Sequence, residues 1–260
     1  MLTDVIRKNY ADALYRAWIT GSRTEHITAL NSEADEEDAY RIQLINVDRM
    51  LSDGYKITGK KIGLTSKPMQ ELFGVDVPDY GHLFDCMDVS GEAIDTDRLI
   101  QPKVEGEIAF ILERDLAGPE VTVQDVLAAT AFVVPALEIV DSRYSNWKIK
   151  LADTVADNGS SALYVLGEAR VKPAEIRLPE VKMDFYKNGM RIDSGSGSAV
   201  LGDPAFCVAW LANKLSAFDV MLRAGEVILS GAITAALIPE KGDRFEAVFP
   251  DFGRVSADFR

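Results

Sequence analysis

The sequence predicts an α+β protein in which helices come first and strands follow. Residues 1–54 carry two helical hydrophobic patterns, whereas residues 55–260 consist mainly of short β-type runs separated by Gly, Pro and Asp turns. A helical start followed by a strand-rich body favours a mixed or mainly antiparallel sheet system. We therefore expect an N-terminal helical region at 1–54 and a β-rich body at 55–260 that form one functional unit.

Two segments near the N-terminus predict helices. The first covers residues 2–19, carries apolar side chains at helical spacing and ends before Gly21. The second covers residues 33–51 and begins after Ser32, with Asp35 three residues later as a weak capping box. A glycine follows each pattern within a few residues, which is a usual stop signal for a helix.

The body contains strand-like runs and further helical patterns. Stretches rich in β-branched and aromatic residues, bounded by turn residues, predict strands. These stretches are 56–64, 106–112, 136–141, 162–167, 181–189, 226–231 and 244–249. Apolar residues at helical spacing predict three helices among them, at 67–73, 123–133 and 204–218.

The composition is that of an ordinary globular protein with an acidic balance. The 260 residues are 47% hydrophobic and carry a formal net charge of -13. Nucleic acid is therefore not the expected partner, because phosphate binding needs clustered Lys and Arg.

No apolar run approaches the roughly 20 residues of a membrane span, and the N-terminus lacks the features of a signal peptide. Cys86 and Cys207 lie far apart and fit buried thiols in a reducing cytosol. We expect a cytoplasmic protein.

Three glutamates interrupt apolar strand-like runs. Glu105 and Glu107 stand two residues apart in "VEGEIAF", so both side chains lie on one face of a strand. Glu138 stands in "PALEIVDSR", where a strand would normally carry Val or Ile. Three carboxylates on two such strands can bind a hard divalent cation, Mg²⁺ or Mn²⁺. The alternative is a solvated sheet face on which Lys or Arg across the strand offsets the charge.

A lysine pair and two glycine-rich stretches add further polar groups. Lys60 and Lys61 alternate in "TGKKIGLTSK", so one of them faces inward if this run is a strand. A lysine near a metal and a small anion can bind a carboxylate or transfer a proton. "DNGSS" at 157–161 and "SGSGS" at 194–198 offer backbone donors and hydroxyls, but on their own they predict only turns.

Read together, these stretches resemble the fumarylacetoacetate hydrolase superfamily. More closely, they resemble its 2-keto-4-pentenoate (2-hydroxypenta-2,4-dienoate) hydratase branch, from meta-cleavage degradation of aromatic compounds. The stretches recur in order over nearly the whole chain. They are "GKKIGLTSKPMQELFGVDVPDYG" (59–81), "QPKVEGEIAFIL" (101–112), "PALEIVDSR" (135–143), "DTVADNGSS" (153–161), "VAWLANKL" (208–215) and "AGEVILSG" (224–231).

The resemblance implies a fold and a metal site. It implies a mixed β-roll body of the superfamily's C-terminal-domain type, with the N-terminal helices packed outside, in a homo-oligomer. It assigns Glu105, Glu107 and Glu138 to a metal triad that binds Mg²⁺ or Mn²⁺. It makes Lys61, directly before "IGLTS", the active-site lysine, so that Lys60 faces the other way.

The implied reaction adds water to a 2-hydroxypenta-2,4-dienoate-type substrate and gives a 4-hydroxy-2-oxo acid. Asp79 and Lys61 are the candidate acid/base residues for its proton transfers. Backbone amides around two pairs of residues are the expected anchors for the substrate carboxylate, namely those of Ser160, Ser161, Ser230 and Gly231.

Two features separate this branch from its sister, the 4-oxalocrotonate (2-oxohex-3-enedioate) decarboxylases. "PDYG" places Asp79 where such hydratases carry an acid/base aspartate and the decarboxylases carry an apolar residue. In contrast, "GAITAAL" at 231–237 resembles the decarboxylases. We favour the hydratase because Asp79 can take part in the chemistry, and we keep the decarboxylase as the alternative.

Two other readings are weaker. The superfamily's carbon–carbon hydrolases activate water with a His–Glu pair, but this chain has only His26, between the N-terminal helices, and His82, expected at the surface after a PDYG turn. A non-catalytic metal-binding subunit that associates with a paralogous pathway enzyme is a further alternative. The presence of the triad, the lysine and the aspartate together argues against it.

Overall fold

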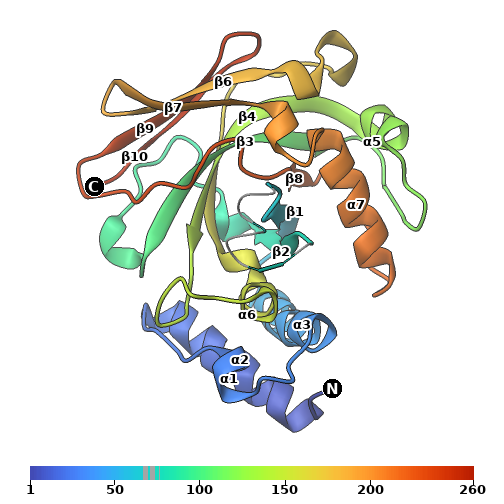
Figure 1. Ribbon diagram of the computed structural model, residues 1–260, viewed down its shortest axis with the longest axis vertical. Helices are drawn as coiled ribbons and strands as arrows, with labels where there is room; N and C mark the ends of the chain where they lie inside the picture. The colour runs from blue at the N-terminus through green and yellow to red at the C-terminus, as the bar shows by residue number, and fades with distance from the viewer. Residues whose placement is uncertain (67–69, 71–73, 76) are drawn as a thin grey trace.

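Two β-sheets form the body of the protein, and the N-terminal helices gather at one end of it (Figure 1). The computed structural model describes residues 1–66, 70, 74–75 and 77–260. The predicted α+β class is confirmed. None of the helices in the described part of the chain combines the length and the hydropathy that a membrane crossing requires.

The larger sheet has six strands in the order β2-β1-β8-β3-β4-β5. Strands β1 and β8 are parallel, and every other neighbouring pair is antiparallel. The short strand β8 therefore joins β1 to β3 in the middle of the sheet. The bounds are β1 Ile57–Gly63, β2 Asp79–Phe84, β3 Pro102–Leu112, β4 Thr130–Asp141, β5 Ser161–Leu166 and β8 Val227–Leu229.

The smaller sheet has four antiparallel strands in the order β10-β9-β6-β7 and lies against the larger one (Figure 1). Gly106 of β3 shows how close the two sheets come, because a Cβ there would meet Met183 Sδ at 2.6 Å and Ala247 Cβ at 3.5 Å. Buried residues of both sheets belong to one hydrophobic cluster, including Ile108 of β3 and Phe185 of β6. The bounds are β6 Lys182–Lys187, β7 Met190–Ser196, β9 Arg244–Phe249 and β10 Gly253–Asp258.

Six α-helices are assigned in the described part of the chain, with short 3-10 turns between other elements. The helices are α1 Asp4–Thr20, α2 Ile27–Leu30, α3 Glu36–Ser52, α5 Val123–Ala129, α6 Leu151–Ala156 and α7 Pro204–Ser216. The 3-10 turns are Asp85–Met87, Thr96–Arg98, Asn158–Ser160, Pro173–Glu175, Leu178–Glu180 and Gly197–Ala199. Helices α1, α3 and α6 form the end of the molecule that contains the N-terminus (Figure 1).

Side-chain caps fix the ends of the first long helices. Thr3 accepts a hydrogen bond from Ile6 N at the start of α1, and Gly21 ends that helix with a φ of 62°. Helix α3 begins three residues later than predicted. Its N-cap is Asp35, which accepts from Asp38 N at 2.8 Å, so the expectation that it starts after Ser32 was wrong.

Three other expectations from the sequence, two helix ends and one turn, differ from the structure. The helix expected at 123–133 ends at Ala129, because the apolar run that follows pairs along the whole of β3 as β4. The expected PDYG turn is the start of β2, whose six residues are all buried and so show no strand alternation. The last predicted helix ends at Ser216 instead of 218. The helix expected at 67–73 lies outside the described residues, apart from Gln70.

Helix α6 and strands β7 and β10 were not predicted. Helix α6 has only six residues, which is too short for a hydrophobic repeat. Strand β7 is largely exposed and polar, so its sequence does not read as a strand.

Lys60 of β1 makes a buried ion pair that we expect to matter for stability. Its Nζ lies 2.7 Å from both carboxylate oxygens of Glu226, and both residues are buried. Lys60→Met leaves the Glu226 charge unpaired, so we predict a loss of about 3–5 kcal/mol in the free energy of unfolding, as is usual for a broken buried pair.

Equilibrium unfolding in urea measures this change. The Lys60→Met/Glu226→Met double variant is the control, because it removes both charges and we expect it to lose less than the single variant. A single variant as stable as the wild type would contradict the prediction.

Candidate active site

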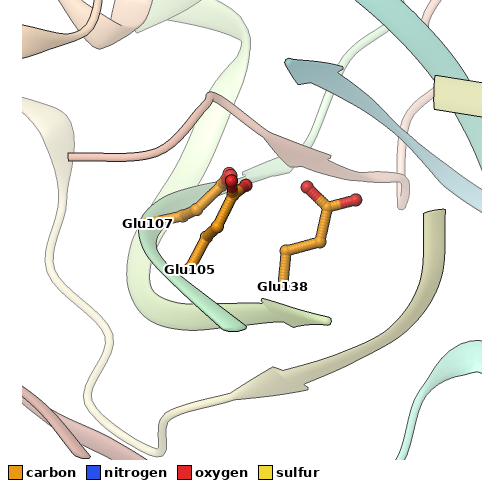
Figure 2. Close-up of side chains that lie close together, drawn as sticks. All are labelled: Glu105, Glu107 and Glu138. Carbon is orange, nitrogen blue, oxygen red and sulfur yellow. The ribbon is translucent and has the colours of Figure 1, made fainter. Parts of the chain in front are cut away.

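The register of two strands brings the three glutamates together. Glu105 of β3 stands directly opposite Glu138 of β4, and Glu107 lies two residues further on the same face of β3. One carboxylate oxygen from each residue lies within 4.8 Å of one from each of the others. Figure 2 shows the three carboxylates pointing toward one another. The predicted convergence of these side chains is present in the structure.

This cluster is buried and poorly compensated. Glu107 and Glu138 are fully buried, and Glu105 is partly buried. Burial, followed by the charges of Glu138 and Glu105, raises the pKa of Glu107 well above its usual value. Burial raises the pKa of Glu138 to about 7 although Lys61 opposes the shift, and burial also raises the pKa of Glu105. Three such carboxylates call for a cation between them.

The unused oxygen atoms fit a bound divalent cation. Glu107 Oε1 and both carboxylate oxygens of Glu138 are buried and have no hydrogen-bond partner among the described residues. Within the described residues, Glu107 Oε2 does have a donor, Gly231 N at 2.8 Å. An all-oxygen set of this kind suits Mg²⁺, which also keeps positions for water or substrate. The three glutamates could therefore hold such an ion.

Lys61 lies beside this cluster, and Lys60 points to the opposite face of β1. Lys61 Nζ is fully buried and lies 3.6 Å from Glu138 Oε2 and 2.9 Å from Gly159 O. Burial disfavours its charge, but the surrounding carboxylates, led by that of Asp79, outweigh this effect and raise its pKa. The prediction that the two lysines face opposite sides of β1 is confirmed, because Lys60 instead pairs with Glu226.

Asp79 completes the cluster from the start of β2. Its Oδ1 lies 3.5 Å from Lys61 Nζ, and its Oδ2 accepts a hydrogen bond from Thr154 Oγ1 at 2.6 Å. Gly63 leaves the room for this meeting, because a Cβ there would lie 2.3 Å from Asp79 Oδ1 and 2.7 Å from Lys61 Nζ. The site therefore places a carboxylate and an ammonium group next to the three glutamates.

Among the four expected anchor residues, the amides of three donate hydrogen bonds within the described part of the protein, whereas the Ser161 hydroxyl does not. Ser160 N donates to Asp157 O at 3.0 Å, and Ser230 N donates to Ile108 O at 3.2 Å. Gly231 N is the donor to Glu107 described above. Ser161 Oγ, in contrast, is buried without a hydrogen-bond partner among the described residues. It lies near Glu138 and lowers the pKa of that carboxyl.

Both histidines lie outside this cluster. His82 is in β2, not in a surface turn, so that expectation was wrong. It is buried on the same face of the β1–β2 pair as Lys60, and its Nδ1 lies 2.9 Å from Gln43 Oε1. Burial, with the charge of Lys60, lowers the pKa of His82 to about 3. His26 caps α2 and stacks on Tyr144. Neither histidine pairs with a glutamate among the residues that the structure describes.

Two residues that contact the site were not identified from the sequence. Thr154, the donor to Asp79, lies on the unpredicted helix α6, and Gly159 lies in the turn after it. Both fall within the "DTVADNGSS" stretch. That stretch marked them as part of a motif, but a single threonine or glycine carries no signal of its contacts.

Cys86 is exposed and Cys207 is buried, and both are free. The expectation of two buried thiols was therefore wrong for Cys86, while the absence of a disulfide between them agrees with the sequence reading.

The family model and the relatives that match this chain belong to the same enzyme group. The model of the fumarylacetoacetate (FAA) hydrolase C-terminal family matches residues 85–260. The chain is 46% identical over 95% of its length to 2-hydroxyhexa-2,4-dienoate hydratase of Comamonas testosteroni, of which it covers 94%. It is 44% identical over 99% of its length to 2-keto-4-pentenoate hydratase of Paraburkholderia xenovorans, of which it covers 96%.

A solved structure matches the whole fold. It is 4-oxalocrotonate decarboxylase from Pseudomonas putida G7, complexed with magnesium and adipate. The TM-score is 0.96 at 36% identity, and the match covers 100% of this chain and 99% of that one. With this fold, the family match and the hydratase relatives, the chain belongs to the fumarylacetoacetate hydrolase superfamily, in its 2-keto-4-pentenoate hydratase branch.

Proposed function

We propose that this chain is a metal-dependent hydratase that adds water to 2-hydroxypenta-2,4-dienoate-type substrates and gives 4-hydroxy-2-oxo acids, in meta-cleavage degradation of aromatic compounds. The observation that carries the proposal is the meeting of Lys61 and Asp79, 3.5 Å apart, beside a buried glutamate triad. The hydratase names of relatives at 44–46% identity support it.

Glu105, Glu107 and Glu138 would hold the metal ion. When bound, Mg²⁺ or Mn²⁺ supplies positive charge that stabilises negative charge on the oxygens of a 2-oxo acid. The magnesium complex of the decarboxylase relative supports Mg²⁺, and the chemistry of the donor set also admits Mn²⁺. The low-dielectric surroundings of the buried triad strengthen this electrostatic effect.

Lys61 and Asp79 carry the proton transfers in this proposal. The dienol loses its O2 proton and gains one at C5, and water then adds its oxygen at C4 and a proton at C3. These steps need groups that donate and accept protons beyond the carboxylate end of the substrate. The ammonium of Lys61 can donate, and the carboxylate of Asp79 can accept. Ser161 Oγ, buried and without a partner in the described structure, is available to the substrate carboxylate.

Decarboxylation of 4-oxalocrotonate is the second candidate. The match to the decarboxylase structure over the whole chain favours it, as does the decarboxylase-like stretch 231–237. Loss of CO₂ from a vinylogous β-keto acid needs mainly an electron sink, so it does not require Asp79. The presence of Asp79 in the buried cluster therefore favours the hydratase.

The proposal extends to the setting of the enzyme. The helical region 1–54 and the body 55–260 act as one functional unit, which is supported by Gln43 of α3, whose Nε2 donates to Tyr80 O and Val155 O. We also propose a cytoplasmic homo-oligomer that associates with a paralogous pathway enzyme, as the family resemblance implies. Light scattering of the purified protein, alone and mixed with that enzyme, measures both associations.

The decisive test gives the purified protein 2-hydroxypenta-2,4-dienoate and 2-oxohex-3-enedioate in separate reactions with Mg²⁺. NMR follows the 4-hydroxy-2-oxo acid and the loss of CO₂. We expect hydration of the first substrate. Release of CO₂ from the dioate without hydration of the dienoate would replace the hydratase by the decarboxylase, and turnover of neither would favour a non-catalytic subunit.

Metal binding is predicted to depend on Glu107. Mg²⁺ at 100 times its Kd should stabilise the wild type by about 2.7 kcal/mol through mass action. Glu107→Gln should abolish both this stabilisation and the activity. The variant should still fold, because it has one repelling charge fewer in the metal-free state. Thermal unfolding with EDTA or Mg²⁺ measures the effect, and an unchanged response to Mg²⁺ would remove Glu107 from the metal site.

Asp79→Asn is predicted to suppress hydration by about 100-fold or more, the usual effect of losing an acid/base group. Deuterium uptake at C5 should partly survive if Lys61 carries out the tautomerisation. NMR in D₂O follows uptake and hydration separately. Hydration at nearly the wild-type rate would show that Asp79 is not an acid/base residue.

A further inference from the structure

Helix α6 and the turn after it, residues 151–160, contact both acid/base candidates. The first contact is the hydrogen bond from Thr154 Oγ1 to Asp79 Oδ2, at 2.6 Å between buried side chains. Asp79 Oδ1 faces Lys61, so the threonine engages the other oxygen of the same carboxylate. A carboxylate held at one oxygen by a strong donor cannot turn freely about its terminal bond. Thr154 therefore fixes the orientation of the Asp79 carboxylate relative to Lys61.

The second contact fixes the ammonium group. Lys61 Nζ donates to Gly159 O at 2.9 Å, whereas its distances to Asp79 and Glu138 are 3.5 and 3.6 Å. The backbone carbonyl is thus the closest of its three partners in the described structure. Without it, the flexible lysine chain could move toward either carboxylate. A Cβ at Gly159 would lie 2.8 Å from Lys61 Cδ, so only glycine allows this close approach.

The turn that presents this carbonyl has an unusual backbone. Asn158, Gly159 and Ser160 have φ values of 57°, 60° and 52° in succession. Left-handed backbone is unfavourable for residues other than glycine, and asparagine tolerates it better than serine. Three such residues in a row persist only where the surroundings hold them.

The Asn158 side chain stabilises the turn because its amide bonds to both the N–H and the C=O of His82 in β2, an arrangement that we call a bracket. Its Oδ1 accepts from His82 N at 2.7 Å, and its Nδ2 donates to His82 O at 2.8 Å. The neighbouring Gly81 stands opposite Lys61 in the β1–β2 register. A Cβ at Gly81 would lie 2.2 Å from Asn158 O, so glycine is needed for the turn to lie this close. Asn158 thus anchors the turn to the strand beside Lys61.

We propose that Thr154 and Asn158 are positioning residues for the reaction: Thr154 orients Asp79, and Asn158 holds the turn whose Gly159 carbonyl fixes Lys61. Neither residue needs to touch the substrate. The inference deepens the proposed function and rests on it, because it assigns the two residues to the same acid/base pair.

Thr154→Val tests the first half, because valine keeps the shape and removes only the hydroxyl. We expect kcat to fall about 10- to 100-fold, the range for losing a hydrogen bond to a charged group, while KM changes less than about 2-fold because substrate binding is retained. Thr154→Ser should restore most of kcat. A kcat within about 2-fold of wild type in Thr154→Val, or no rescue by serine, would overturn this half.

Thr130→Val is the matched control. Thr130 is also buried, and its Oγ1 donates to Val126 O at 2.7 Å, but this bond joins β4 to α5 away from the cluster. It should leave kcat unchanged. An equal loss of kcat in Thr130→Val would show that any lost buried hydroxyl has the effect, and would also overturn the proposal.

Asn158→Gly tests the second half, because glycine accepts the left-handed backbone and removes only the bracket. We expect kcat to fall about 10-fold or more with little change in KM. Asn213→Ala is the matched control. Asn213 brackets Val121 in the same way, with bonds of 2.7 and 2.9 Å to its N and O. It should lose stability and keep kcat, and equal losses of kcat would overturn this half.

Crystal structures of the variants separate this inference from the reaction class. Each variant is compared with wild type on whichever of the two substrates the wild type converts. A decarboxylase result would end the hydratase proposal and the kcat expectation for Thr154→Val, because decarboxylation does not require Asp79, but the positions of Asp79 and Lys61 in the variant structures would still test the positioning roles. The structures should show a turned Asp79 carboxylate in Thr154→Val and a displaced Lys61 Nζ in Asn158→Gly. Unmoved side chains in both variants would overturn the positioning roles, even if the wild type converts neither substrate.

Discussion

The mutual repulsion of three clustered carboxylates, two of them fully buried, is the constraint around which this site is organised. The antiparallel register of β3 and β4 places Glu105 opposite Glu138, and alternation places Glu107 on the same face. The Gly231 amide and the Lys61 ammonium offset part of the negative charge, and three buried carboxylate oxygens have no hydrogen bond in the described part of the protein. This remaining negative charge is what a divalent cation requires.

Strand alternation also places the two lysines of β1 on opposite faces, with different partners. Lys61 faces the carboxylates, whereas Lys60 is buried on the other face with Glu226. A lysine without a partner would be costly on either face. Each is therefore matched by acidic residues that come from other strands or from the loop before β8. Two glycines of this region leave the space that these contacts need: Gly63 makes room for the side chains of Asp79 and Lys61, and Gly81 makes room for the backbone of Asn158.

Features that follow from the alternation of side chains along a strand could be predicted from the sequence. Features that depend on contacts between residues far apart in the sequence could not. The shared face of Glu105 and Glu107 and the opposite faces of Lys60 and Lys61 come directly from a period of two. Strand β2 was missed because it is buried on both faces, so its sequence does not alternate. The roles inferred here for Thr154 and Asn158 depend on partners 75 and 76 residues away, which no local pattern can reveal.

The placement of β8 has a consequence for how the chain is made. Three residues near the C-terminus, Val227–Leu229, lie between β1 and β3 in the middle of the large sheet. During synthesis, β2-β1 and β3-β4-β5 therefore emerge as two separate ribbons, each with an unpaired edge that could join another chain. The acidic pair on β3 and β4 can form early, but Lys61 reaches it only when β8 closes the gap. The nascent protein therefore holds its carboxylates together before their cationic partner arrives, and its sheet edges stay open until residues 227–229 have been translated.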